Sequence, residues 1–255
     1  MTERAIAEQA ARAAGAVLAA HGTPERVRHK GAVDLVTEVD LACERAVREV
    51  LARHTPEVPV LGEEGEAVDA ATRWVVDPLD GTTNFVHGFP FYAVSVALEV
   101  DGESRVGVVL DGVRGRLYSA ERGTGAWCDG ARLRVSETRG LGQALVGTGF
   151  PYDRQQPGRA AFYTRRVTAV LGRAQGVRRA GAAALDLAML ASGALDAFWE
   201  FDLHRWDVAA GRLLVTEAGG RFTGHDGGEP DADRPSPLAS NGWLHEAMQS
   251  VLDLS

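Results

Sequence analysis

The sequence DPLDGTTNF at residues 77–85 places Asp77 and Asp80 three residues apart, directly after an apolar run that ends at Val76. Two carboxylates at a strand end, with a proline stiffening the turn between them, can converge on one hard cation. Residues 81–83 are expected to open a short helix, whose N–H groups suit a phosphate. The pattern predicts a metal ion and a phosphate at one point. An ordinary turn is the alternative, because Asp, Pro and Gly are common in turns.

Three further acidic residues can join this pair. Glu63 follows the apolar residues 58–61, whereas Asp40 and Asp207 each lie in the first turn of an expected helix. Each also has an ordinary interpretation, because loops are commonly charged and acidic side chains favour helix N-termini. The case for a site therefore depends on the whole set.

Taken together, these motifs resemble the magnesium-dependent, lithium-sensitive inositol monophosphatases, and residues 181–200 are similar to the bacterial branch. The matching segments are VDLVTEVD at 33–40, GEE at 62–64, WVVDPLDGTTNFVH at 74–87, WDVA at 206–209 and EAGG at 217–220. The resemblance implies an α+β fold, a layered αβαβα sandwich of the inositol monophosphatase and fructose-1,6-bisphosphatase type.

The resemblance also implies roles for individual residues. One Mg²⁺ would be held by Glu63, Asp77 and the Leu79 carbonyl, a second by Asp77, Asp80 and Asp207, and a weaker third by Glu63 with waters. The catalytic residues would be Asp40, Glu63 and Thr82, with Asp40 and Thr82 orienting the attacking water. The substrate contacts would be Asp80, Gly81, Thr82, Thr83, Ala183, Glu200 and Asp207.

The implied activity is hydrolysis of a phosphomonoester by in-line attack of an activated water, with myo-inositol 1-phosphate as the expected substrate. Oxygen ligands without clustered His or Cys favour Mg²⁺, two to three ions, over zinc or copper. Fructose-1,6-bisphosphatase, or another sugar or nucleotide phosphatase of the superfamily, is the alternative, because Arg178 and Arg179 could serve a second phosphate. A regulatory binding partner with secondary catalysis is the non-enzymatic alternative.

Composition limits the partners. The 255 residues carry a net charge of −8 with a pI near 5.4, which argues against binding nucleic acid or an anionic membrane by bulk electrostatics. Two cysteines are too few for a disulfide framework, and no apolar run is long enough for a membrane span. We expect a cytoplasmic protein acting on a small phosphomonoester, and the resemblance adds a homodimer.

Hydrophobic periodicity predicts an N-terminal α+β subdomain, 1–140, with the metal and phosphate site, and a C-terminal α/β subdomain, 141–255, that supplies Asp207 and substrate contacts. The polar loop at 26–34 is expected to act as a lid, and 224–237 is expected to be a loop. The expected helices are 2–20, 38–55, 159–171, 182–192, 206–218 and 244–252, and the expected strands are 74–77, 91–100, 104–110, 116–120, 144–148, 176–179 and 196–200.

Overall fold

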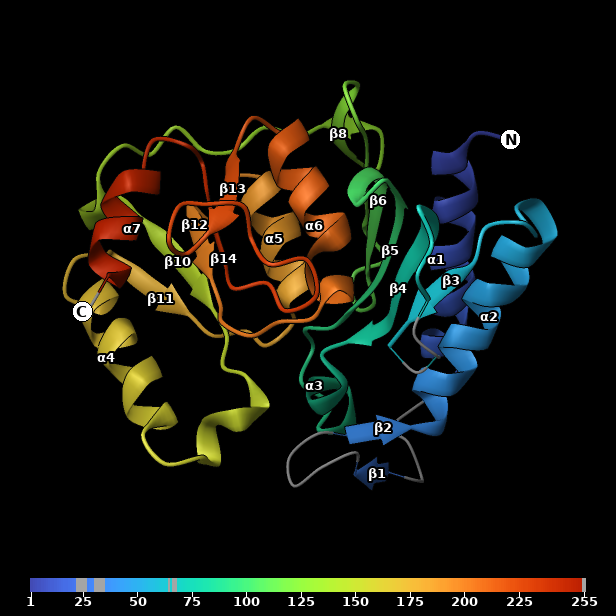
Figure 1. Ribbon diagram of the computed structural model, residues 1–255, viewed down its shortest axis with the longest axis horizontal. Helices are drawn as coiled ribbons and strands as arrows, with labels where there is room; N and C mark the ends of the chain where they lie inside the picture. Colours follow the sequence, from blue (N-terminus) through green and yellow to red (C-terminus); the bar gives the residue numbers. More distant parts are fainter. Residues whose placement is uncertain (22–26, 30–34, 64, 66–67, 254–255) are drawn as a thin grey trace.

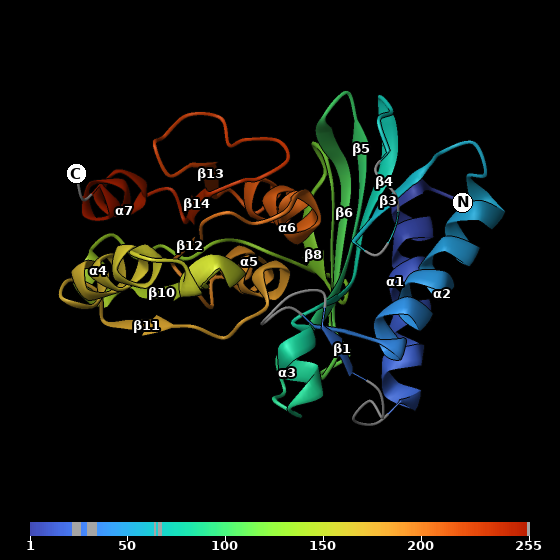
Figure 2. The ribbon, with the colours of Figure 1, turned by 60° about the horizontal axis from the view of Figure 1, so that its bottom comes forward.

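The computed structural model describes residues 1–21, 27–29, 35–63, 65 and 68–253. Five layers of alternating helices and sheets make up the molecule (Figures 1 and 2). Helices α1 (Glu3–Ala20) and α2 (Glu38–His54) cover the outer face of a seven-stranded sheet. Helices α5 (Ala183–Ala191) and α6 (Arg205–Glu217) lie between this sheet and a five-stranded one. The predicted αβαβα sandwich is therefore confirmed.

The larger sheet is a meander in the order β3-β4-β5-β6-β7-β8-β9, in which only the β3–β4 pair is parallel. Asp101 and Gly102, with φ of 51° and 81°, make the tight turn between β5 and β6. The strands are β3 (Val60–Gly62), β4 (Thr72–Asp80), β5 (Ala93–Val100), β6 (Glu103–Asp111), β7 (Leu117–Glu121), β8 (Gly125–Cys128) and β9 (Ala131–Arg132).

An irregularity near the end of β4 decides where its two aspartates point. Asp77 pairs with Ser95, and Asp80 pairs with Ala93. Side chains alternate between the faces of a regular strand, so residues three apart would point to opposite sides. The partners on β5 are only two residues apart, and the extra residue on β4 forms a bulge that puts both aspartates on the same face.

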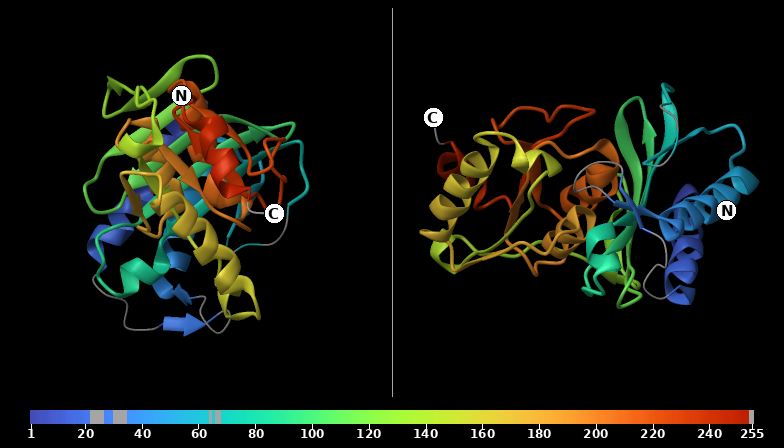
Figure 3. Two further views of the ribbon diagram at one scale, coloured as in Figure 1. Left: turned by 90° about the vertical axis from the view of Figure 1, so that its left-hand side faces the viewer. Right: turned by 90° about the horizontal axis from the view of Figure 1, so that it is seen from below.

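The smaller sheet has the order β11-β10-β12-β14-β13, with β10 parallel to both of its neighbours. Helices α4 (Arg159–Leu171) and α7 (His245–Leu252) cover its outer face, so that the two ends of the chain lie at opposite sides of the molecule (Figure 3). The strands are β10 (Leu145–Thr148), β11 (Gly176–Arg178), β12 (Ala197–Trp199), β13 (Arg221–Gly224) and β14 (Pro237–Ser240).

Three apolar cores hold the layers together. The first lies between α1, α2 and the larger sheet, where Ala7, Ala10, Ala11 and Ala14 of α1 are fully buried and allow close approach. The second joins α5 and α6 to the larger sheet and reaches the smaller one, and the third lies under α4 and α7. Because the middle core includes residues from both sheets, α5 and α6 bind the two halves together. The division at residues 140 and 141 stays a prediction.

One expected loop was wrong in part. Residues 27–29 of the expected loop at 26–34 form β1 (Val27–His29), which pairs with β2 (Leu35–Thr37) beside the short helix α3 (Thr82–Val86). The remaining residues of that predicted lid lie outside the described residues. The loop at 224–237 joins β13 and β14, an antiparallel pair that hydrophobic periodicity did not predict. Within the described part of the chain, no helix is long and apolar enough to span a membrane.

Candidate active site

The carboxylates predicted to bind metal gather where β4 ends. Because β3 runs parallel to β4 with Gly62 opposite Val76, the next residues along each strand, Glu63 and Asp77, follow at the same edge. Burial raises the pKa of Asp77 well above its usual range, and the nearby charges of Glu63, Asp80 and Asp207 raise it further. The fold thus brings together four acidic residues from three separate parts of the sequence.

Asp80 is fixed by the first turn of α5. Its carboxylate accepts hydrogen bonds from the backbone N–H groups of Ala183, at 3.2 Å, and Ala184, at 2.7 Å. A carboxylate is stabilised at a helix N-terminus, where N–H groups are unpaired and the helix dipole is positive. Burial raises the pKa of Asp80 to about 6, although these backbone bonds oppose the shift. The same contact places the predicted substrate residue Ala183 beside Asp80.

Asp207 lies in the first turn of α6, where its carboxylate accepts a hydrogen bond from the backbone N–H of His204 at 2.7 Å. This reciprocal capping arrangement confirms the ordinary interpretation of Asp207 as a cap. It leaves the second carboxylate oxygen for another partner. Burial, and then the charge of Asp80, raise the pKa of Asp207 well above its usual range.

Thr82 and Asp40, predicted to orient the attacking water, are in direct contact. The Thr82 hydroxyl lies 2.9 Å from Oδ1 of Asp40 and 3.0 Å from the Leu79 carbonyl, with one proton to donate between them. Both Thr82 and Asp40 are buried. Gly81, which precedes Thr82, has φ of 92°, and a Cβ there would come within 3.1 Å of the Phe91 carbonyl. Only glycine fits this turn without strain.

A cavity of about 500 Å³ opens beside these residues. Of the predicted substrate contacts, Asp80, Gly81, Thr83, Ala183, Glu200 and Asp207 line it, whereas Thr82 does not. Burial raises the pKa of Glu200 to about 8, with Asp80 adding to the shift and Arg179 opposing it. Glu200 is therefore mostly a neutral carboxylic acid at pH 7, able to donate as well as accept hydrogen bonds.

The two neighbouring arginines of the prediction behave differently. Arg179 lines the cavity, whereas Arg178 does not and donates a hydrogen bond to the Val177 carbonyl. The Asn84 amide donates to the carbonyls of Ala180, at 2.9 Å, and Phe91, at 2.6 Å. Asn84 thereby ties α3 to the segment that carries Arg179. The Asn84 side chain therefore has a structural role.

Several cavity residues were missed from the sequence, namely Phe150, Asp153, Asp202, His204 and Arg234. They come from three loops that meet only in the folded chain, so no local spacing indicated them. Gly149 was missed as well: a Cβ there would lie 2.1 Å from the Glu200 carboxylate oxygens. Gly149 lies beside Glu200 only through the pairing of β10 with β12, so the sequence carried no signal for it.

The acidic residues fit a divalent cation that takes few protein ligands. No ion pair within the described part of the chain joins Asp77, Asp80 or Asp207 to a Lys, Arg or His, although the charge of Arg179 opposes the rise in the pKa of Asp80. Within the residues that the structure describes, no group of three or more His, Cys, Asp or Glu side chains is arranged to hold a metal ion by itself. Mg²⁺ is commonly held by one or two carboxylates together with water and substrate phosphate oxygens. The site is thus compatible with Mg²⁺ and is not a closed protein cage.

A five-layered α+β sandwich with an acidic cavity at the junction of its two sheets defines the class of protein. A model of the Inositol monophosphatase family matches residues 2–253, and the chain belongs to this family. It is 44% identical over 230 residues to the inositol-1-monophosphatase of Rhizobium meliloti, covering 89% of this chain and 86% of the relative. It is 42% identical over 257 residues to Nus factor SuhB of Pseudomonas aeruginosa, covering 97% and 94%.

Solved structures agree. The extragenic suppressor protein SuhB from Bartonella henselae superposes with a TM-score of 0.92 at 39% identity, covering 98% of each chain. An IMPase from Thermotoga maritima superposes with a TM-score of 0.91 at 32% identity, covering 99% of this chain and 97% of that one. An IMPase/NADP phosphatase complexed with Mg²⁺ and phosphate superposes with a TM-score of 0.79 at 26% identity, covering 90% of this chain and 87% of that one.

Proposed function

We propose that this chain hydrolyses a phosphomonoester with Mg²⁺, and that myo-inositol 1-phosphate is its best substrate. The observation that carries the proposal is the cluster of Glu63, Asp77, Asp80 and Asp207, placed beside the hydrogen-bonded pair Thr82 and Asp40. The neighbour complexed with Mg²⁺ and phosphate and the relative named inositol-1-monophosphatase support it.

Two to three Mg²⁺ ions would be held by the four carboxylates and the Leu79 carbonyl. Bound there, they would supply charge stabilisation for the attacking and leaving oxygens and lower the pKa of a water. In the overall reaction, water oxygen bonds to phosphorus, the ester P–O bond breaks, and the proton ends on the leaving alcohol. Uncatalysed hydrolysis is so slow that the site must lower the barrier by roughly 20 kcal/mol.

This chain's own residues would orient the reactants. When the Thr82 hydroxyl donates to Asp40, a lone pair of Thr82 can accept a hydrogen bond from the attacking water and fix its direction. The N–H groups of Gly81 and Thr82 would bind phosphate. Positioning of this kind acts mainly in the transition state.

Substrate choice would depend on the far side of the cavity. Glu200, with a pKa of about 8, can exchange hydrogen bonds with the hydroxyl groups of a polyol. Arg179 is the feature that favours the alternative, a sugar bisphosphate, because it is the member of the predicted arginine pair that reaches the cavity.

Phosphate release from a panel of phosphomonoesters tests the proposal. The panel should contain myo-inositol 1-phosphate, fructose 1,6-bisphosphate, a nucleoside bisphosphate and glycerol 2-phosphate, each with and without Mg²⁺. We expect inositol 1-phosphate to have the highest kcat/KM. A preference for the bisphosphates would establish the alternative, and no release from any ester would refute the enzymatic proposal.

Thr82→Ala tests the orienting role. We expect kcat to fall by about 100-fold or more with KM changed little, because a water-orienting hydroxyl stabilises the transition state and contributes little to substrate binding. Steady-state kinetics on inositol 1-phosphate measure both values, with Thr164→Ala, an exposed threonine on α4, as the matched control. An unchanged kcat would remove Thr82 from the mechanism.

The relative named Nus factor SuhB favours a second candidate, a role as a binding partner beside catalysis. We also propose a cytoplasmic homodimer that is inhibited by Li⁺ and uses no nucleic acid as substrate. Light scattering would test the dimer, since a mass near the 27.1 kDa of one chain would contradict it.

A further inference from the structure

The first turn of α6, which carries Asp207, is fastened to the larger sheet by a buried ion-pair network. Arg205 lies two residues before Asp207, and its Nη1 is 2.8 Å from Oε2 of Glu99 on β5. Only 11% of the Arg205 side chain and 6% of the Glu99 side chain are exposed. The same Glu99 oxygen lies 3.1 Å from Nε of Arg73 on β4. Arg205 also reaches Asp233, 3.2 Å away in the loop before β14.

Two hydroxyl groups reinforce this attachment. Ser95 of β5 donates to the Trp206 carbonyl at 3.2 Å, and Ser104 of β6 donates to the Ala209 carbonyl at 2.8 Å. Contacts from the sheet to α6 therefore lie on both sides of Asp207 in the sequence. Because the ends of helices are their least stable parts, such contacts decide where the first turn rests.

The strand register links this attachment to the other carboxylates. Along the β4–β5 ladder, Arg73 pairs with Glu99 and Asp77 pairs with Ser95. The two residues of β5 that hold the first turn of α6 are thus the partners of Arg73 and Asp77 on β4. A shift of Arg205 would move Asp207 relative to Asp77, which remains fixed in the strand.

We propose that Arg205 and Glu99 are positioning residues, which set the separation of Asp207 from Asp77 across the two halves of the molecule. The inference rests on the proposed function, because that separation matters for catalysis only if the carboxylates act together. Replacing a residue that orients a metal ligand commonly lowers metal affinity or activity 10- to 100-fold, and we expect a loss of about that size here.

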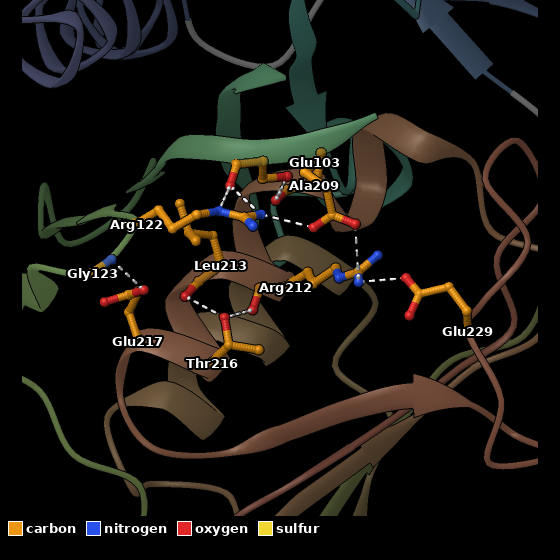
Figure 4. Close-up of polar contacts among 10 residues, drawn as sticks. Glu103, Arg122, Gly123, Ala209, Arg212, Leu213, Thr216, Glu217 and Glu229 are labelled. Carbon is orange, nitrogen blue, oxygen red and sulfur yellow. Dashed lines mark hydrogen bonds and ion pairs between the residues drawn. The ribbon is translucent and has the colours of Figure 1, made fainter. Parts of the chain in front are cut away.

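The same helix offers a matched control, shown in Figure 4. Arg212, seven residues after Arg205, pairs with Glu229 at 2.5 Å and lies 4.0 Å from Glu103. At the end of α6, Glu217 accepts hydrogen bonds from the backbone N–H groups of Gly123 and Gly125, each at 2.8 Å. These contacts also fasten α6, but about 8 Å along the helix axis from Asp207 at Arg212 and about 15 Å at Glu217.

The experiment compares Arg205→Gln with Arg212→Gln in the full chain. For Arg205→Gln we expect kcat on inositol 1-phosphate to fall 10- to 100-fold, KM to change by less than about threefold, and the Mg²⁺ concentration for half-maximal activity to rise. For Arg212→Gln we expect kcat within about threefold of wild type. Amide hydrogen exchange in residues 205–209 should be at least about 10-fold faster in Arg205→Gln only.

Arg205→Lys keeps the positive charge but cannot span Glu99 and Asp233 together, so we expect an intermediate loss of kcat; it also serves if the Gln variant does not fold. Equal kcat losses in the Arg205 and Arg212 variants, or unchanged exchange in Arg205→Gln, would overturn the proposal. A wild type that releases no phosphate would refute the proposed function instead, and the exchange rates would still report whether Arg205 holds the turn.

Discussion

Two groups of buried carboxylates lie on β4, β5 and α6, and they differ in their partners. Glu99 has an arginine on either side, one from β4 and one from α6. Asp77, Asp80 and Asp207 lie near one another and accept hydrogen bonds from backbone N–H groups, that of Leu79 in the case of Asp77. Glu99 is compensated by direct ion pairs, whereas the three aspartates form no ion pair among the described residues, although the charge of Arg179 reaches Asp80; we call them the uncompensated group.

This difference separates structure from function. Burying a charge is costly unless it is paired, and a protein gains no stability from crowding carboxylates together. Buried carboxylates that stay close together despite this cost, with pKa values shifted by burial and by like charge, are typical of functional sites. The comparison thus teaches that the protein supplies cations for Glu99, whereas Asp77, Asp80 and Asp207 form no ion pair within the described residues, which supports the proposal that a cation from outside joins them.

Asp77→Asn should give the largest effect on the uncompensated group. We expect kcat to fall by about 1000-fold or more, because this carboxylate is expected to contribute to two ions. Without Mg²⁺ the variant should melt no lower than wild type, since one of several like charges is gone. Mg²⁺ at about 100 times its Kd should stabilise the wild type by about 2.7 kcal/mol and the variant much less. Kinetics and thermal melts measure both.

Asp111→Asn is the control for that prediction. Asp111 is fully buried, but it pairs with Arg114 and accepts a hydrogen bond from the backbone N–H of Val113. Its replacement should lower the melting temperature and leave kcat near the wild-type value. If Asp77→Asn behaved like Asp111→Asn, the distinction between the two groups would fail.

Glu99→Gln should give the next effect, on stability. Removing the carboxylate leaves Arg73 beside Arg205 without its counter-charge and leaves Arg205 with only the exposed Asp233, which should cost about 3–5 kcal/mol. Urea unfolding measures the loss, with Glu103→Gln, whose side chain is 50% exposed, as the control expected to cost about 1 kcal/mol or less. Equal, small losses would mean that Glu99 is not the centre of the network.

Glu200→Gln should give an effect on stability that changes with pH. The folded protein raises the pKa of Glu200 from 4.5 to about 8, so it holds a proton that the unfolded chain releases. This contribution to stability is present below pH 4.5 and is lost as the pH rises through 8. Gln resembles the protonated acid and does not titrate. Between pH 4.5 and 8 the free energy of unfolding of the variant should therefore rise relative to that of wild type, by at most about 1.4 kcal/mol per pH unit.

Denaturant unfolding of both proteins at several pH values measures this difference. A stability difference that stays constant across the window would mean that Glu200 is ionised in the folded protein. Glu246→Gln, on the exposed end of α7, provides a control. Backbone and Arg221 hydrogen bonds lower the pKa of Glu246, so this variant should not become more stable relative to wild type as the pH rises.

Much of this arrangement could be predicted from sequence because it depends on local order. The apolar run before Asp77, the turn through Gly81 and the helix that opens before Asp207 each have short-range signals, and the structure contains all three. The β4 bulge has no such signal. It follows from pairing with β5 across the turn, and it alone brings Asp77 and Asp80 to one face.

What could not be predicted depends on contacts between distant segments. The pairing of β13 with β14 spans the loop between Gly224 and Pro237, and β14 inserts between β12 and β13. Arg205 and Glu99 are 106 residues apart, and either one read alone is an ordinary surface charge. Only the packing of α6 against the sheet shows that they meet.

The most direct test of the account is phosphate release from myo-inositol 1-phosphate by the wild-type protein under control of the metal. Activity should require Mg²⁺, disappear in excess EDTA, and return when Mg²⁺ is added back, because the uncompensated carboxylates need a cation to act. Full activity in excess EDTA would contradict the account, since the acidic cluster would then have no catalytic use for a metal ion.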